Sequence, residues 1–312
     1  MPLHPQVEGL LNQMAAAGGK PTNQMTPEEC RAVFDGLFAS LPPSQTKLAG
    51  IVDRNVPGPA GPIKTRVYTP EGKGPFPVLV FFHGGGFVLG NLESHDSVCR
   101  ELSGGANVVV VATDYRLSPE HRFPAAADDC IAVTRWVVKN AAQISGDPKR
   151  VAVGGDSAGG NLAAVVSQQL RDQDQIKLAA QLLIYPATRF DGVATKSMVD
   201  NATGYLLQRD DMDWFRSHYL GPNVDGRDVR ISPILAKDLA GLPPTLVQTC
   251  EFDPLRDEGE DYGNALKAAG VPTIISRHDG SIHAAFSFFT IMEPGRRMVD
   301  EAIRWLQETL RA

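Results

Sequence analysis

The feature that most constrains the fold is a series of short apolar runs separated by segments with apolar residues at helical spacing. Residues 77–82 and 107–112 are almost continuously apolar, as is typical of strands buried on both faces. Further strands are predicted at residues 151–153, 180–185, 245–249 and 272–276. Helical patterns cover residues 126–142, 160–171, 257–269 and 294–310. Because strands alternate with helices, the sequence predicts an α/β fold with a mostly parallel central sheet flanked by helices.

The chain of 312 residues fits one main domain with a smaller helical addition. Within residues 51–68, apolar and polar residues alternate on both sides of a Gly/Pro turn. This pattern predicts an antiparallel hairpin at a sheet edge. Residues 186–228 interrupt the strand–helix alternation and predict an inserted helical cap. The helical residues 1–50 are expected to form the N-terminal part of that cap, which leaves residues 51–185 and 229–312 as the main α/β domain.

Composition and charge narrow the class of protein. Hydrophobic residues make up 43% and charged residues 21% of the chain, as in ordinary globular domains. The formal net charge is −6 and the basic residues are scattered, so we expect no nucleic-acid partner. The first ten residues lack an apolar run like that of a signal peptide, and no 18 consecutive residues are apolar. We therefore expect a cytoplasmic protein with no membrane partner, whose four dispersed cysteines are reduced and mostly buried.

A glycine-rich turn joins the strand predicted at residues 151–153 to the helix that follows. Within it, Gly155, Ser157 and Gly159 fit the pattern G-x-S-x-G, which places a serine on a sharp strand-to-helix turn. Such a turn exposes the hydroxyl at a helix N-terminus, where negative charge is favoured. The alternative is a phosphate-binding turn, but Asn161 stands where a P-loop needs lysine followed by serine or threonine. The pattern favours Ser157 as a nucleophile.

Three consecutive glycines follow His83, directly after the apolar run at residues 77–82. Glycines leave main-chain N–H groups unobstructed, as an oxyanion hole requires. We expect the amides of Gly85, Gly86 and Ala158 to be the donors. His83 precedes the serine, whereas the catalytic base follows the serine in folds that carry the G-x-S-x-G turn. His83 and Gly84 are therefore expected to organise the loop.

The acid of such a site is expected after a late strand that follows the serine. The run at residues 245–249 leads into Glu251, Asp253 and Asp257. Asp253 lies in the turn after the strand, where Pro254 restricts the backbone, whereas Asp257 opens the next helix and is better suited to its N-terminus. Asp253 is the predicted acid, with Glu251 in reserve.

The base is expected after the following strand, and three histidines come after Ser157 in the chain. His218 lies in the predicted cap, with no acid at a strand end before it. His283 has several predicted loop residues before it, which would allow it to bend back over the sheet edge. His283 is thus the predicted base, and His278 is expected to be a surface residue.

With these residues in place, the chain resembles the bacterial hormone-sensitive-lipase-like esterases over nearly its whole length. The resemblance rests on HGGG at 83–86, DYRLSPEH at 114–121, FPAAADD at 123–129, GDSAGG at 155–160 and DPLRDE at 253–258. It implies an α/β-hydrolase fold with a cap, and a triad and oxyanion hole at the positions derived above. It also implies short-chain esters as substrates and a homodimer formed through an edge strand such as residues 272–276.

One position departs from the family, which usually has glycine directly after the catalytic histidine. Here Ala284 follows His283, and its methyl group restricts the backbone beside the imidazole. We expect activity to survive with an altered rate or specificity. The aromatic cap residues Tyr205 and Trp214 are further candidate specificity residues.

The combined prediction is a serine carboxylesterase that hydrolyses small, short-chain acyl esters without a metal or organic cofactor. Lactones, carbamates or acetylated natural products could be cleaved by the same groups. A small-molecule receptor on the same fold is the rival from another class, because fold alone does not decide function. All three triad positions are filled, which favours the enzyme. The acidic cap argues against a lipase that works at membrane surfaces.

Overall fold

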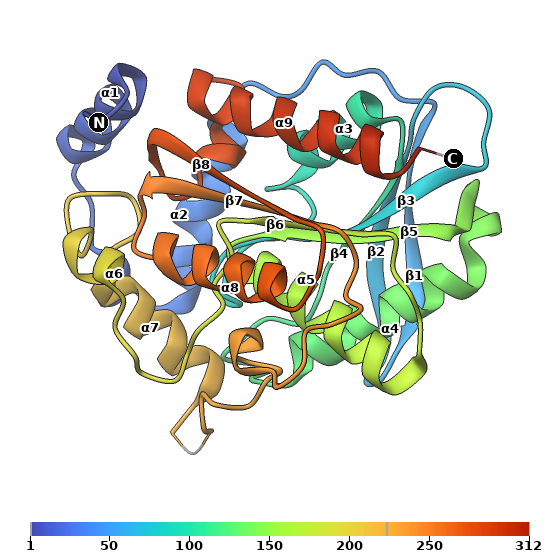
Figure 1. Ribbon diagram of the computed structural model, residues 1–312. Coiled ribbons are helices and arrows are strands. Elements are labelled where there is room, and N and C mark those ends of the chain that lie inside the picture. Colours follow the sequence, from blue (N-terminus) through green and yellow to red (C-terminus); the bar gives the residue numbers. More distant parts are fainter. Residues whose placement is uncertain (1, 223, 312) are drawn as a thin grey trace.

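The computed structural model describes residues 2–222 and 224–311 (Figure 1). Within these residues, eight strands form one sheet in the order β1-β2-β4-β3-β5-β6-β7-β8. The strands are β1 Gly50–Gly58, β2 Gly61–Thr69, β3 Phe76–Phe82, β4 Val109–Thr113, β5 Gly146–Asp156, β6 Ala180–Ile184, β7 Thr245–Phe252 and β8 Thr273–Ile282. β1, β2 and β4 pair antiparallel, and the other neighbours are parallel. The predicted mostly parallel sheet and the edge hairpin are confirmed.

Helices cover both faces of the sheet (Figure 1). α3 (Asp96–Ala106) and α9 (Glu293–Thr309) pack into one apolar core, and α4 (Ala125–Asn140), α5 (Ala158–Gln169) and α8 (Arg256–Ala268) into the other. Every residue of α5 is buried, including the polar Asn161 and Gln168, whose side-chain amides donate hydrogen bonds to main-chain carbonyls. α3 was not predicted from the sequence. Its buried positions Val98, Cys99, Leu102 and Ala106 have helical spacing, but the polar residues between them masked the pattern.

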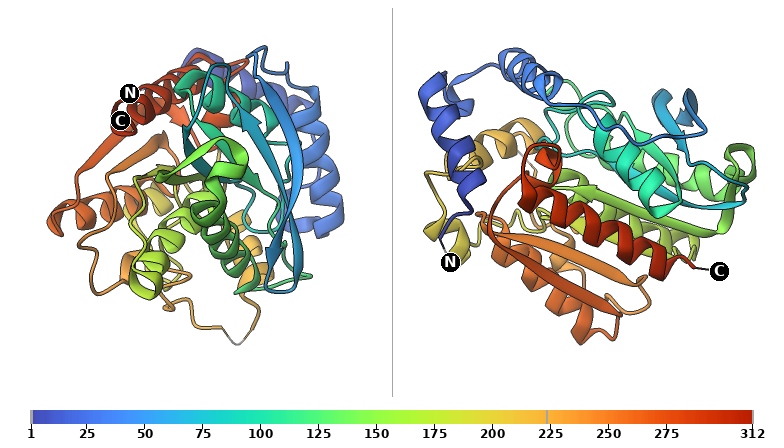
Figure 2. Two further views of the ribbon diagram at one scale, coloured as in Figure 1. Left: turned by 90° about the vertical axis from the view of Figure 1, so that its right-hand side faces the viewer. Right: turned by 90° about the horizontal axis from the view of Figure 1, so that it is seen from above.

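Four helices gather beyond the carboxyl ends of the strands (Figures 1 and 2). They are α1 (Pro5–Ala17), α2 (Pro27–Ser40), α6 (Lys196–Asp200) and α7 (Arg209–Leu220). Thr26 and Glu29 form a capping box that starts α2, with Pro27 in the first helical position. The Asn23 side-chain amide donates to Asp210 Oδ2 at 3.4 Å, so the N-terminal and inserted segments are in contact.

Shorter turns complete the chain: η1 Thr22–Gln24, η2 Ala141–Ile144, η4 Pro233–Leu235 and η5 Ala285–Phe288 are 3₁₀ helices, and η3 Leu170–Asp174 is a π-helical turn. The four cysteines carry free, buried thiols, as expected. Among the described residues, no helix combines the length and apolar character that crossing a membrane requires.

β8 is longer than predicted, since it continues to Ile282 instead of ending near residue 276. Its second half contains charged and polar residues, because this edge strand has a neighbour on one side only. The expectation of several loop residues before His283 is therefore wrong. His283 directly follows the strand.

Candidate active site

Ser157 lies in the tight turn between β5 and α5. Its backbone has φ 55° and ψ −117°, a conformation that L-residues rarely adopt and that stores strain at functional sites. The Ser157 amide donates to the Ile184 carbonyl at 2.8 Å, which ties the turn to β6. A Cβ at Gly159 would collide with the Phe82 carbonyl, so a side chain there is excluded. The tight glycine turn inferred from the sequence is present.

The three predicted residues Ser157, His283 and Asp253 are joined by hydrogen bonds. His283 Nε2 lies 3.0 Å from Ser157 Oγ, and His283 Nδ1 lies 2.7 Å from Asp253 Oδ2. Asp253 is fully buried, and its Oδ1 accepts a hydrogen bond from the Leu255 amide at 2.8 Å. Both carboxylate oxygens are thus held, and the arrangement can move a proton from the serine to the imidazole.

Strand register explains how the acid and the base meet. Cys250 pairs with His278, but after an irregularity Phe252 pairs with Ile282. The residues that follow on the two strands, Asp253 and His283, therefore lie side by side at the carboxyl edge of the sheet. A regular ladder would have placed a different residue opposite Asp253.

The other acids and histidines considered from the sequence have different partners. Glu251 Oε2 accepts a hydrogen bond from the Gly280 amide at 2.7 Å, and Asp257 Oδ2 accepts one from the Ser197 amide at 2.6 Å. The predicted position of His278 on the surface is wrong. Its side chain is 12% exposed and forms an ion pair with Glu301 at 2.9 Å.

The glycine loop presents free amides beside Ser157. Gly85 and Gly86 have φ values of 114° and 61°, which favour glycine, and both line the same cavity as Ser157. Ala158 is the first residue of α5, whose N-terminus favours negative charge. Within the described residues, none of these three amides donates a hydrogen bond, so all three can bind an oxyanion.

A buried network behind the loop supports it. His83 Nδ1 donates to the Gly84 carbonyl at 2.8 Å, and its ring stacks on Tyr115 at 4.2 Å between centroids. Burial lowers the pKa of His83 to about 3, so its ring is neutral and suited to the loop-organising role predicted for it. The Gly84 amide donates to Asp156 Oδ1 at 2.9 Å, which anchors the loop to the serine turn.

Asp156 and His95 extend this network and were missed from the sequence. Asp156 is 4% exposed, and its Oδ1 lies 3.2 Å from His95 Nε2. Burial raises the pKa of Asp156, but the charge of His95 and the hydrogen bonds outweigh it, so the pKa lies below its ordinary value. The sequence feature that could have indicated Asp156 is its position inside the G-x-S-x-G motif, directly before Ser157.

A cavity of about 420 Å³ opens over Ser157 and His283. Apolar side chains of the N-terminal segment and of residues 206–215 form much of its wall, including Met14, Met25, Val33, Phe34, Leu37, Phe38, Leu206, Leu207, Met212 and Phe215. The candidate specificity residues Tyr205 and Trp214 do not line this cavity. Tyr205 packs on Phe252, and Trp214 packs edge-on against Phe215. Their direct neighbours Leu206 and Phe215 line the cavity instead.

In the part of the chain that the structure describes, no group of three or more His, Cys, Asp or Glu side chains could hold a metal ion.

Ala284, the third candidate specificity residue, does line the cavity. Its backbone is left-handed, with φ 66° and ψ 3°. A residue with a Cβ pays roughly 1–2 kcal/mol in this conformation, and glycine does not. The Ala284 methyl group thus strains the backbone and also forms part of the cavity wall beside His283.

Replacing Ala284 with glycine should raise the free energy of unfolding by about 0.5–1 kcal/mol, because the relieved strain exceeds the extra entropy of the unfolded chain. It should also change kcat/KM for at least some esters, since the cavity wall next to the base loses a methyl group. Urea unfolding and a panel of ester substrates would measure both effects. Lower stability together with identical kinetics on every ester would contradict this interpretation.

Glu258, in the first turn of α8, is a second buried acid in the cavity wall. Its Oε1 accepts hydrogen bonds from the Thr188 and Arg189 amides at 2.7 and 3.3 Å. No described residue is a partner for its Oε2. Burial raises the pKa of Glu258 to about 8, although the two amide hydrogen bonds oppose the shift. The carboxyl group is therefore protonated at neutral pH.

The raised pKa predicts that stability falls as the pH rises. The folded state holds the Glu258 proton up to about pH 8, whereas the unfolded chain releases it near its ordinary pKa of 4.5. Between pH 5 and 8 the free energy of unfolding of the wild type should fall by on the order of 3 kcal/mol relative to that of Glu258→Gln, whose side chain cannot ionise. Urea unfolding across this range would measure the difference. Glu71→Gln, at an exposed position, is the matched control, and its free energy of unfolding should follow that of the wild type at every pH. If the free energy of unfolding of Glu258→Gln fell with pH as steeply as that of Glu71→Gln, the prediction would be contradicted.

Comparisons with known proteins identify relatives of this chain. A family model described as "alpha/beta hydrolase fold" matches residues 79–287. The carboxylic ester hydrolase LipN of Mycobacterium tuberculosis is 45% identical over 82% of this chain and 69% of its own length. The ethyl acetate hydrolase of Pseudomonas putida is 34% identical over 97% and 99% of the two chains. The solved structure of a hyperthermophilic esterase from Pyrobaculum calidifontis matches with a TM-score of 0.93 and 40% identity, covering 99% of each chain.

Proposed function

The chain belongs to the alpha/beta hydrolase fold family and is a carboxylic ester hydrolase, and we propose that Ser157, His283 and Asp253 are its catalytic triad. The resemblance to hormone-sensitive-lipase-like esterases is thereby confirmed at the level of the family. The observation that carries the triad is the unbroken hydrogen-bond chain from Ser157 Oγ through both imidazole nitrogens to Asp253.

In the proposed mechanism, Ser157 Oγ attacks the ester carbonyl while His283 Nε2 takes the hydroxyl proton. Asp253 keeps the proton of the imidazole on Nδ1 and stabilises the imidazolium. The amides of Gly85, Gly86 and Ala158 bind the oxyanion, and the tetrahedral intermediate collapses as His283 returns the proton to the leaving alcohol. Water then attacks the acyl-enzyme with His283 as base, which releases the carboxylic acid and restores the serine. No metal or organic cofactor takes part in this scheme.

We further propose that the substrates are small esters with short acyl chains, roughly from acetyl to hexanoyl. A largely apolar cavity of about 420 Å³ supports this, because it accommodates a small ligand whose orientation is set by a few polar groups. The relative from Pseudomonas putida is named for ethyl acetate. Lactones, carbamates and acetylated natural products remain alternative substrates for the same groups.

The proposal is tested with p-nitrophenyl esters from acetyl to hexadecanoyl. We expect kcat/KM to be highest between acetyl and hexanoyl and to fall at least about tenfold for dodecanoyl, because the helical cap limits the space for longer chains. A maximum at the longest chains would contradict the short-chain assignment. A fluorophosphonate should label Ser157, and failure to label would favour the inactive receptor.

The homodimer, the cytoplasmic location and the division into a cap (1–50, 186–228) and a catalytic domain (51–185, 229–312) also remain proposals. An interface through β8 is supported by its place at the edge of the sheet and by Ile274, which is 52% exposed. Sedimentation equilibrium would test the dimer. The proposed division is supported by the contact between Asn23 and Asp210.

A further inference from the structure

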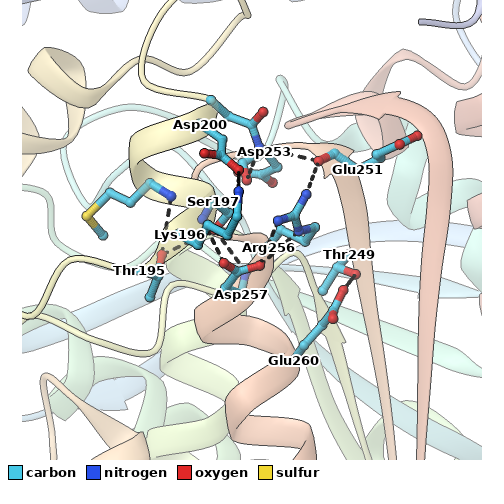
Figure 3. Close-up of polar contacts among 12 residues, drawn as sticks. Thr195, Lys196, Ser197, Asp200, Thr249, Glu251, Asp253, Arg256, Asp257 and Glu260 are labelled. Atoms are coloured by element: carbon cyan, nitrogen blue, oxygen red, sulfur yellow. Dashed lines mark hydrogen bonds and ion pairs between the residues drawn. The ribbon is translucent and has the colours of Figure 1, made fainter. Parts of the chain in front are cut away.

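We propose that the short cap helix α6 positions the catalytic acid, with Ser197 and Asn201 as positioning residues that hold the turn carrying Asp253. This inference rests on the proposed role of Asp253. Figure 3 shows α6 facing the turn between β7 and α8, with Ser197 directed toward Asp257. The two segments are about fifty residues apart in sequence, so only the tertiary structure brings them together.

Ser197 and Asp257 make reciprocal hydrogen bonds. The Ser197 amide donates to Asp257 Oδ2 at 2.6 Å, and the Asp257 amide donates to Ser197 Oγ at 3.1 Å. Ser197 Oγ in turn donates to the Pro254 carbonyl at 2.9 Å. Ser197 is fully buried, so these bonds are shielded from competing water. One cap residue thus holds both sides of the turn that follows Asp253.

Asn201 holds the acid residue itself. Its side-chain Nδ2 donates to the Asp253 carbonyl at 3.1 Å and to the Glu251 carbonyl at 3.3 Å. Asn201 is 4% exposed and stands four residues after Ser197, so both side chains project from the same side of α6. The Glu251 carbonyl also accepts from Arg256 Nη1 at 2.9 Å (Figure 3). The main chain is therefore fixed by hydrogen bonds at Glu251 and at Asp253, the residues on either side of Phe252.

The sheet alone leaves this segment without regular support. The β7–β8 ladder is irregular between Cys250 and Phe252, directly before the acid, and strand β7 ends at Phe252. Beyond that residue the backbone is held by the turn and by α6. Because a shift of about 1 Å in a catalytic group can cost 10²-fold in rate, the hydrogen bonds from α6 bear directly on how Asp253 meets His283.

The same helix also contacts the substrate space. Met198, next to Ser197, lines the cavity, and its amide is capped by Thr195 Oγ1 at 3.2 Å. One face of α6 therefore lines the cavity in which the ester would bind, and the other face is hydrogen-bonded to the turn that carries Asp253. Displacement of the cap should consequently change kcat as well as KM.

The test compares Asn201→Ala and Ser197→Ala with Asp200→Ala, whose exposed side chain pairs with Lys196 on the outer face of the same helix. With active sites counted by fluorophosphonate, Asn201→Ala should lower kcat about 10- to 100-fold with KM changed less than about threefold. Ser197→Ala should lower kcat about fivefold or more, and Asp200→Ala should match the wild type.

The pH profile separates positioning from simple loss of stability. A displaced Asp253 stabilises the imidazolium less, so the acidic limb of kcat/KM should move to lower pH in Asn201→Ala and remain in place in Asp200→Ala. Wild-type kcat and an unmoved acidic limb in folded Asn201→Ala would overturn the inference. If Asn201→Ala fails to fold, the same two readouts on Ser197→Ala decide. Full activity of Ser157→Ala would instead refute the triad itself, so the two failures are distinguishable.

Discussion

Replacing Ser157 with alanine is expected to lower ester hydrolysis by at least about 10⁴-fold, to the level left by substrate binding and the oxyanion donors. The variant lacks the hydroxyl that lies 3.0 Å from His283 Nε2, so no acyl-enzyme can form at this position. Release of p-nitrophenol from the acetyl and butyryl esters is the measurement. An undiminished rate would overturn the assignment of the nucleophile.

Removing one hydroxyl should leave the fold intact, and circular dichroism and thermal unfolding provide the control. Ser157→Ala should unfold at a temperature close to that of the wild type, because alanine keeps the Cβ, so the backbone conformation of the turn and its strain are unchanged and only a hydroxyl is lost. It should also lose fluorophosphonate labelling. Labelling retained at another residue would point to a different nucleophile.

Replacing Asp253 with asparagine is expected to lower kcat on the order of 10⁴-fold. The amide has nearly the shape of the carboxylate, but its NH2 group donates where a carboxylate oxygen accepted, and it carries no charge to stabilise the imidazolium. With Asp253 fully buried and 2.7 Å from His283 Nδ1, water cannot substitute for the lost interaction. Single-turnover acylation kinetics would measure the loss directly.

Glu251→Gln is the matched control, since Glu251 was the alternative acid in the sequence. Its carboxylate accepts from the Gly280 amide and does not meet the base in this structure. We expect its kcat to stay within about threefold of the wild type, as for a change away from the reacting atoms. A larger loss in Glu251→Gln than in Asp253→Asn would reverse the assignment.

The chemistry at this site depends on two supports that come from different parts of the chain. Asp156 connects the serine turn to the glycine loop through the Gly84 amide. α6 connects the cap to the acid turn. Ser157 and Asp253 thus each lie on a turn that a second segment holds in place, as preorganised catalysis requires.

The sequence by itself determined the local features of this protein. Continuous apolar runs predicted the parallel strands, and G-x-S-x-G predicted the strained turn at Ser157, because both patterns depend on residues close together in the chain. Chain order after the serine left a few candidate acids and histidines, among which Asp253 and His283 were preferred; the loop expected before His283 was wrong. Asp253 and His283 are the residues that the structure joins by hydrogen bonds.

Only the tertiary structure decided which side chains face the cavity and which segments support one another. Tyr205 and Trp214 were candidates by residue type, yet their neighbours Leu206 and Phe215 line the cavity, because the direction of each side chain depends on how these segments pack. The irregular β7–β8 register and the contact of Asn201 with Asp253 join residues 30 to 52 positions apart. Such contacts depend on how distant segments pack, and no local pattern encodes their geometry.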